Sequence, residues 1–279
     1  MPRFSRFPSR RQDGQRSVKS VIEPCSRACD IPRVNVTATR DGLRLSQHGV
    51  VISELRTSPG PTHSVFDVLA ALIDVLAPNG PVGVLGFAGG GMIAPLRALG
   101  VETPIETVDL DGEAYELFQE HCPEWSERVH WEQADAGAWL HRQAPRFGLL
   151  VEDLSVPQDG DVIKPAITWE RLPGLIRRRL RPGGVAVFNL MLPPGGTWRD
   201  ALARVAGEFR QTCVVELDEF ENRILIGGAA LPTARSLGQD LRQALRRLRS
   251  RQAAKLRART WSSRIRVESR AGDWQSAPP

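Results

Sequence analysis

Three aspartates and one glycine cluster stand where a nucleoside could be bound. The cluster, GFAGGG at 86–91, directly follows the apolar run VGVL, and Asp109, Asp135 and Asp153 each end or closely follow a later apolar run. A glycine loop between a strand and a helix lets backbone approach a ligand and leaves helix N–H groups free to bind it. A carboxylate about 20 residues further on is typical of ribose recognition. The pattern predicts a nucleoside pocket.

Each candidate residue has a role in this interpretation. Asp109 would bind the ribose hydroxyls, and Asp135 would reach the base. The loop residues expected against the nucleoside carry little or no side chain, and they are Gly86, Ala88, Gly89 and Gly90, with Ala136 beside Asp135. Two plainer interpretations stay open: a glycine run can simply pack tightly, and an aspartate before a helix can serve only as its N-cap.

The elements that must position these residues alternate along the chain. Three short β-prone runs at 33–57 predict an antiparallel β-meander, and 64–76 has helical spacing of apolar residues. Strand-like and helix-like segments then alternate to 209, and two β-prone runs close the series as a hairpin. This order predicts an α/β domain with a mostly parallel sheet, in which ligands bind at the carboxyl ends of strands where the strand order reverses. The expected domains are a basic, disordered segment 1–32, the meander 33–57, the nucleoside-binding domain 62–231 and a basic helical or disordered tail 232–279.

The closing hairpin and the ordered motifs GFAGGG, VDLDG and QADAG look like the Rossmann-like, class I S-adenosylmethionine-dependent methyltransferase fold. Within that fold, residues 33–228 are most similar to the spermidine synthase (polyamine aminopropyltransferase) family, which has a β-meander ahead of the core. The family's GGGDGG motif matches 86–91, its V-E-I-D matches 108–111, and its D-G pair matches 135–136. Its catalytic D-S-S-D-P loop matches 153–157, and its Y-H-E matches 62–64.

The resemblance implies Asp153 as the base or orienting group for an acceptor amine, with His63 near the acceptor. For His63 the alternative is an exposed loop histidine. It also implies a homodimer, a small-molecule amine or other nucleophile as acceptor, and S-adenosylmethionine or its decarboxylated form as co-substrate, with no metal.

The departures from the family concern charge. Gly89 stands at the acid of the glycine motif, Val156 at the second acid of the catalytic loop, Ile52 at a glutamine and Thr62 at a tyrosine. Protonated amines are held by carboxylates, so these losses put both the decarboxylated donor and a diamine acceptor in question. Three hypotheses therefore stand: a spermidine-synthase-like transferase, a methyltransferase acting on a small molecule or RNA, and a non-catalytic nucleoside-binding protein.

The composition indicates the class of protein and its cellular compartment. The chain has 279 residues, 41% of them hydrophobic and 25% charged, which is ordinary for a soluble globular protein. No apolar run is long enough for a membrane span, and four irregularly spaced cysteines predict free thiols and a cytoplasmic protein.

Charge is distributed unevenly along the chain. The formal net charge is +5, yet both ends are strongly basic, so the middle is acidic. The basic C-terminal segment would suit nucleic acid or an acidic surface, although a solvated helix is the plainer interpretation. As a separate tail, 232–279 should be removable without loss of nucleoside binding.

Overall fold

The computed structural model describes residues 34–47, 49–158 and 161–262, all of which belong to one compact unit. The basic segment expected at 1–32, with Cys25 and Cys29, lies outside the described residues.

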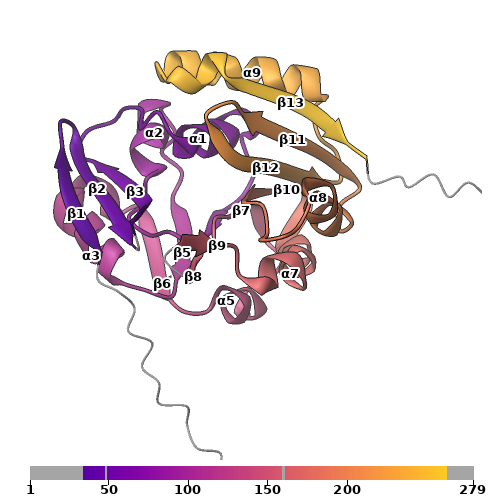
Figure 1. The fold of residues 1–279 in the computed structure, drawn as a ribbon, viewed down its shortest axis with the longest axis horizontal. Helices are drawn as coiled ribbons and strands as arrows, with labels where there is room; N and C mark the ends of the chain where they lie inside the picture. Colours follow the sequence, from indigo (N-terminus) through magenta and orange to yellow (C-terminus); the bar gives the residue numbers. More distant parts are fainter. Residues whose placement is uncertain (1–33, 48, 159–160, 263–279) are drawn as a thin grey trace, which may run out of the picture. The chain divides into compact units, whose positions relative to one another are not determined.

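An eight-stranded sheet forms the centre of this unit (Figure 1). Its strand order is β13-β11-β12-β10-β7-β4-β5-β6; the strands from β10 to β6 are parallel, and β12, β11 and β13 add antiparallel pairs. The bounds, in chain order, are β4 (Val82–Leu85), β5 (Ile105–Asp109), β6 (Val129–Gln133), β7 (Phe147–Glu152), β10 (Leu180–Leu190), β11 (Gln211–Leu217), β12 (Phe220–Gly228) and β13 (Leu256–Trp261). The predicted α/β class, with a mostly parallel sheet and an antiparallel closing hairpin, is confirmed.

Helices cover both faces of the sheet, and each face has its own apolar cluster. One face packs against α1 (Val65–Leu76), α2 (Ile93–Ala98), α3 (Glu113–His121), α4 (Pro123–Ser126) and α9 (Ala234–Arg247). The other face packs against α5 (Ala136–Arg142), α7 (Leu172–Arg179) and α8 (Trp198–Ala206), with the short α6 (Ala166–Trp169) alongside. Buried strands such as β4, in which every residue is inaccessible, are what a sheet covered on both faces requires.

The N-terminal β-meander is present as predicted. It forms a separate three-stranded antiparallel sheet of β1 (Asn35–Thr39), β2 (Gly42–Gln47) and β3 (Val50–Arg56). Leu45 and Leu55 point into the main core from this sheet and are buried, whereas every residue of β1 is exposed. The meander is therefore attached to the domain through β2 and β3.

A second small hairpin was not expected from the sequence. The polar loop predicted after β7 contains β8 (Val156–Gln158) and β9 (Asp161–Ile163), which pair with each other as a two-stranded sheet.

The segment predicted as a basic tail from residue 232 is instead part of the α/β core, as far as it is described. Helix α9 lies against α1 and along β13, and β13 pairs with β11 as the edge strand of the main sheet (Figure 1). A short 3-10 helix, η1 (Arg251–Ala254), connects the two. The leucines whose spacing indicates one helical face, Leu241, Leu245 and Leu248, are buried. Deleting 232–279 would thus remove an edge strand and part of the core.

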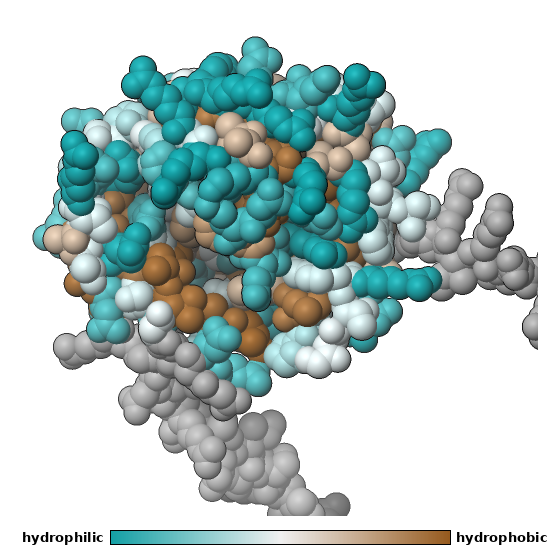
Figure 2. Space-filling view, turned by 45° about the horizontal axis from the view of Figure 1, so that its top comes forward, coloured by the Kyte–Doolittle hydropathy of each residue, from teal (hydrophilic) through white to brown (hydrophobic). Residues whose placement is uncertain are grey.

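Basic residues of this segment pair with acids from the middle of the same chain. Arg247 pairs with Asp74, and three further pairs join β13 or its start to the β11–β12 hairpin: Lys255–Glu219, Arg257–Asp218 and Arg259–Glu216. Figure 2, in which the α9 side is turned toward the reader, shows hydrophilic residues over most of that surface. Part of the charge imbalance along the sequence is therefore balanced within the fold.

Two further findings concern expectations from composition. Within the described ranges no helix is long and apolar enough to cross a membrane. Cys122 and Cys213 are free and buried, and burial raises the pKa of each thiol to about 11, so neither is a reactive thiolate.

The docking of α9 gives the first testable prediction. Leu241→Ala should lower the free energy of unfolding by about 2–5 kcal/mol, because it leaves a cavity in a fully buried interface. Gln243→Ala, on the exposed side of the same helix, should change it by no more than about 0.5 kcal/mol. Urea denaturation of both variants checks this; equal, small effects would mean that α9 does not belong to the cooperative core.

Candidate functional site

The sheet reverses its strand order between β4 and β7, and the glycine loop and Asp153 follow these two strands. The two strand ends approach each other closely. A Cβ at Gly86 would lie 2.6 Å from the Asp153 carbonyl oxygen, and Gly86 has φ +84°, a conformation that favours glycine. The Asp153 N–H in turn donates to the Leu85 carbonyl at 2.8 Å. The glycine loop and the backbone of Asp153 therefore lie side by side at the switch point.

The side chain of Asp109, at the end of β5, binds backbone N–H groups of the glycine loop. The N–H groups of Phe87 and Ala88 both donate to Asp109 Oδ2 at 2.7 Å, and Leu110 N–H donates to Oδ1 at 2.7 Å. Ala88 adopts φ +45°, a strained conformation for a residue with a side chain. A carboxylate has about four acceptor positions, so Asp109 Oδ1 retains capacity for a ribose hydroxyl.

The β-meander covers the middle of the loop. A Cβ at Gly89 would lie 2.5 Å from Leu45 Cδ1 and 3.0 Å from Leu55 Cδ1, with Ser53 Cβ 3.3 Å away. Gly89, which stands where the spermidine synthase family has an acid, therefore faces two buried leucines. A carboxylate there would displace apolar contacts and lose its hydration.

Asp135 does serve as an N-cap, the plainer role weighed from the sequence. Its Oδ1 accepts from Ala138 N–H at 2.8 Å at the start of α5, whose first residue, Ala136, is buried. Within the described ranges Asp135 Oδ2 has no protein partner, so capping leaves one oxygen able to bind a base. The two roles do not exclude each other.

The Asp153 carboxylate is oriented by an amide chain that crosses three strands. Asn189 Nδ2 on β10 donates to Asp153 Oδ1 at 2.7 Å, and Asn222 Nδ2 on β12 donates to Asn189 Oδ1 at 3.0 Å. Burial raises the pKa of the Asp153 carboxyl; Lys164 and the Asn189 hydrogen bond oppose this rise, and the Asp109 charge adds to it. Oδ2 of Asp153 has no partner among the described residues, so one carboxylate oxygen is available for a further hydrogen bond.

His63 lies beside η1. It precedes α1 with φ +61°, its Nδ1 accepts from Arg251 N–H at 3.4 Å, and its carbonyl accepts from Gln252 Nε2 at 2.9 Å. Gln252 also donates to Glu219 in the β11–β12 turn, which lies at the carboxyl end of β10. His63 is therefore near the edge of the sheet that carries the site, and no contact joins it to Asp153 in the described part of the chain.

The sequence did not predict a buried ion pair that includes the residue next to Asp153. Glu152, the last residue of β7, and Lys164, after β9, form a salt bridge of 3.2 Å with side chains 0% and 2% exposed. Asn189 and Asn222 were missed as well. A charged residue inside the otherwise apolar FGLLVE was the available signal for Glu152, whereas nothing local marks the two asparagines.

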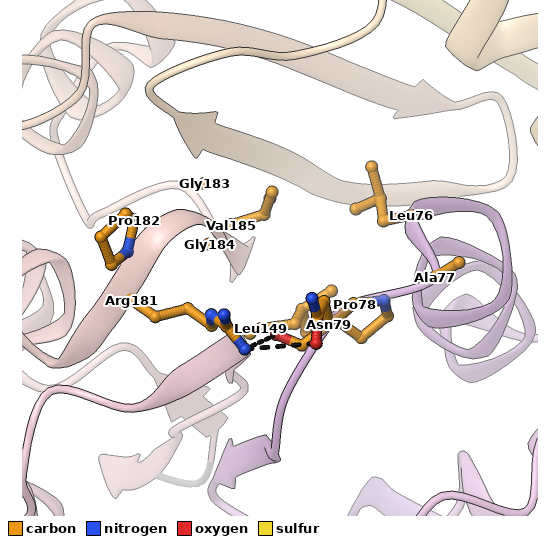
Figure 3. A pocket seen from close by; sticks show the side chains of 11 residues that line it. Leu76, Ala77, Pro78, Asn79, Leu149, Arg181, Pro182, Gly183, Gly184 and Val185 are labelled. Carbon is orange, nitrogen blue, oxygen red and sulfur yellow. Dashed lines mark hydrogen bonds between the residues drawn. The ribbon is translucent and has the colours of Figure 1, made fainter.

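A pocket of about 310 Å³ lies at the opposite, amino edge of the parallel strands (Figure 3). It is lined by the residues after α1 and by the starts of β7 and β10, and Arg181 bridges it by donating to the Asn79 carbonyl at 2.9 Å. It holds none of the strand-end acids and is separate from the candidate site. Within the described ranges no group of three or more His, Cys, Asp or Glu side chains is placed to hold a metal ion.

Comparison with solved structures found proteins that share the fold. A probable spermidine synthase from Corynebacterium glutamicum ATCC 13032 matches with a TM-score of 0.63 and 19% identity, over 81% of this chain and 87% of that chain. Spermidine synthase from Thermotoga maritima matches at 0.59 and 14%, over 80% and 77%. Human methyltransferase-like protein 13, in complex with SAH, matches at 0.51 and 19%, over 74% and 96%.

The chain has the fold of these transferases. At such identities the likeness shows the fold alone, and no family model matches the chain. The resemblance drawn from the motifs agrees with these structural neighbours.

The strand-end contact gives a second prediction. Gly86→Ala should destabilise the protein and weaken nucleoside binding, because the added methyl would push the Asp153 backbone away. Gly100→Ala is the matched control: its φ of +82° carries the same backbone strain, but nothing lies within 4 Å of the added methyl. Unfolding and nucleoside titration should show a loss at Gly86 larger by at least about 1 kcal/mol; equal losses would refute the close approach.

Proposed function

We propose that this protein is a transferase that takes an S-adenosyl sulfonium compound as donor and uses Asp153 to orient and deprotonate an acceptor. The observation that carries the proposal is the Asp153 carboxylate itself. The Asp153 backbone lies directly beside the glycine loop at the switch point, and its carboxylate is held through Oδ1 by Asn189, with Oδ2 free of partners among the described residues.

The donor site follows from the residues around the glycine loop. Asp109 Oδ1 would accept a ribose hydroxyl, and Asp135 Oδ2 would accept from the base while Oδ1 caps α5. A strained Ala88 and a Gly86 without space for a side chain are features of a loop shaped for close backbone approach. The solved neighbours include one bound to SAH and a spermidine synthase bound to the transition-state analogue AdoDATO.

The acceptor chemistry follows from Asp153. An ammonium acceptor must lose a proton before its nitrogen can attack, and Asp153 Oδ2 would take that proton. As the new bond to nitrogen forms, the carbon–sulfur bond of the donor breaks and the sulfonium becomes a neutral thioether. Burial, which raises the pKa of Asp153, brings this carboxylate nearer to the proton affinity that a general base needs.

The surroundings of Gly89 favour a second candidate, methyl transfer from S-adenosylmethionine. Leu45 and Leu55 occupy the position where a carboxylate would hold the free amine of a decarboxylated donor. Aminopropyl transfer would then need another anchor for that amine. The donor that the protein binds therefore identifies the transferred group.

Titration calorimetry with S-adenosylmethionine and with its decarboxylated form, side by side, tests the proposal. Tighter binding of S-adenosylmethionine would indicate methyl transfer, and tighter binding of the decarboxylated form would indicate aminopropyl transfer to an amine. If neither binds, the proposed function is wrong and the fold serves a non-catalytic role.

Asp153→Asn gives a further prediction. The amide keeps the size of the side chain but cannot accept the proton, so kcat should fall by about 10²–10⁴-fold with donor affinity nearly unchanged. Glu221→Gln, which removes an exposed carboxylate from β12, is the charge-matched control and should leave kcat unchanged. Steady-state kinetics and calorimetry measure the two effects; an unchanged kcat in Asp153→Asn would remove Asp153 from the mechanism.

A further inference from the structure

The buried Glu152–Lys164 pair brackets Asp153 in the chain. Glu152 Oε1 accepts from Leu154 N–H at 3.1 Å, from Thr168 Oγ1 at 3.1 Å and from Lys164 Nζ at 3.2 Å. Lys164 Nζ also donates to the Leu154 carbonyl at 2.6 Å. The residue before Asp153 and the residue after it are thus held by one cluster.

The pair also closes the base of the β8–β9 hairpin. Asp153 leaves β7 immediately after Glu152, and the chain returns at Lys164, directly after β9. Thr168, from α6, is fully buried against the same carboxylate oxygen. The conformation of the strand end that carries Asp153 is therefore set by side chains on both sides of the hairpin.

The pair lies in an apolar layer. Glu152 is in register with Leu85 on β4 and Phe188 on β10, both of which belong to the buried cluster under α5, α7 and α8. Glu152 Oε2 is buried with no partner in the described part of the chain. Two well-packed apolar residues are often at least as stable as a buried ion pair, so stability alone gives little reason for this arrangement.

Charge gives a reason. Asp153 follows Glu152 in the chain. Burial raises the pKa of Asp153, and the nearby charge of Asp109 raises it further, whereas the positive charge of Lys164 lowers it. Burial raises the pKa of Glu152 too, and again Lys164 opposes the rise. Asn189, from β10, is the neutral group that faces Asp153. Lys164 is thus a cation that acts on both Glu152 and Asp153.

We propose that Lys164 is a positioning residue for Asp153: its ammonium group, held by Glu152 and the Leu154 carbonyl, fixes the backbone on both sides of Asp153 and supplies a positive charge that acts on the Asp153 carboxylate. Its importance for catalysis rests on the proposed function. Its effect on Asp153 itself does not.

The test removes the positive charge of Lys164 in two different variants and compares both with a control variant that changes no charge. Lys164→Met leaves Glu152 buried and unpaired, which can prevent folding. The double variant Glu152→Gln with Lys164→Met leaves no unpaired buried charge. Thr168→Val is the matched control, because it removes one hydrogen bond to the same oxygen of Glu152 without changing any charge.

The readout is the titration of the Asp153 carboxyl carbon, followed by ¹³C NMR in the full chain and assigned with Asp153→Asn. Both variants without Lys164, the single variant if it folds, should titrate at higher pH than Thr168→Val. In the active enzyme the acid limb of kcat/KM should move to higher pH in the same order. At a pH below this acid limb, kcat/KM of the variants without Lys164 should be about tenfold or more lower than that of Thr168→Val, and the difference should disappear at high pH.

A double variant that titrates like Thr168→Val would overturn the proposal and leave the pair a structural feature only. Since the carbon titration needs no substrate, it decides this inference even if the protein binds neither donor.

Discussion

A methyl group at Gly86 would lie 2.6 Å from the Asp153 carbonyl oxygen, so the ends of β4 and β7 can meet only through a residue without a side chain. This contact places the glycine loop next to the backbone of the residue that carries the candidate carboxylate, Asp153. The rest of the site is built around it: Asp109 ties the loop by two backbone hydrogen bonds, and Asn189 and Asn222 orient Asp153 across three strands. A parallel sheet supplies the geometry, because its strands end at one edge.

Two groups of elements flank the parallel part of this sheet. The β-meander brings Leu45 and Leu55 over Gly89 and so gives the middle of the loop an apolar cover. At the other end, α9 and β13 extend the sheet, and their arginines pair with acids of the β11–β12 hairpin and α1. The basic C-terminal segment thus finds acidic partners in its own domain, as far as it is described.

Much of this could be predicted from the sequence, since it depends on local patterns. The strand ends at Asp109 and Asp153, the cap at Asp135 and the meander all follow from apolar runs and turn residues. What escaped prediction depends on contacts between distant residues. The Arg-rich run from 234 is amphipathic like any surface helix, and only its packing on α1 shows that it belongs to the core. Likewise the sequence around Lys164 is that of an ordinary loop lysine, and only the fold of the β8–β9 hairpin brings Lys164 to Glu152.

The most direct test of the proposed donor site is a crystal structure of the full chain grown with S-adenosylhomocysteine. The proposed site would hold the ribose hydroxyls on Asp109, the base beside Asp135 Oδ2, and the sulfur end between the glycine loop and Asp153. A nucleoside bound elsewhere, or held at the glycine loop with Asp153 turned away from the sulfur, would contradict it.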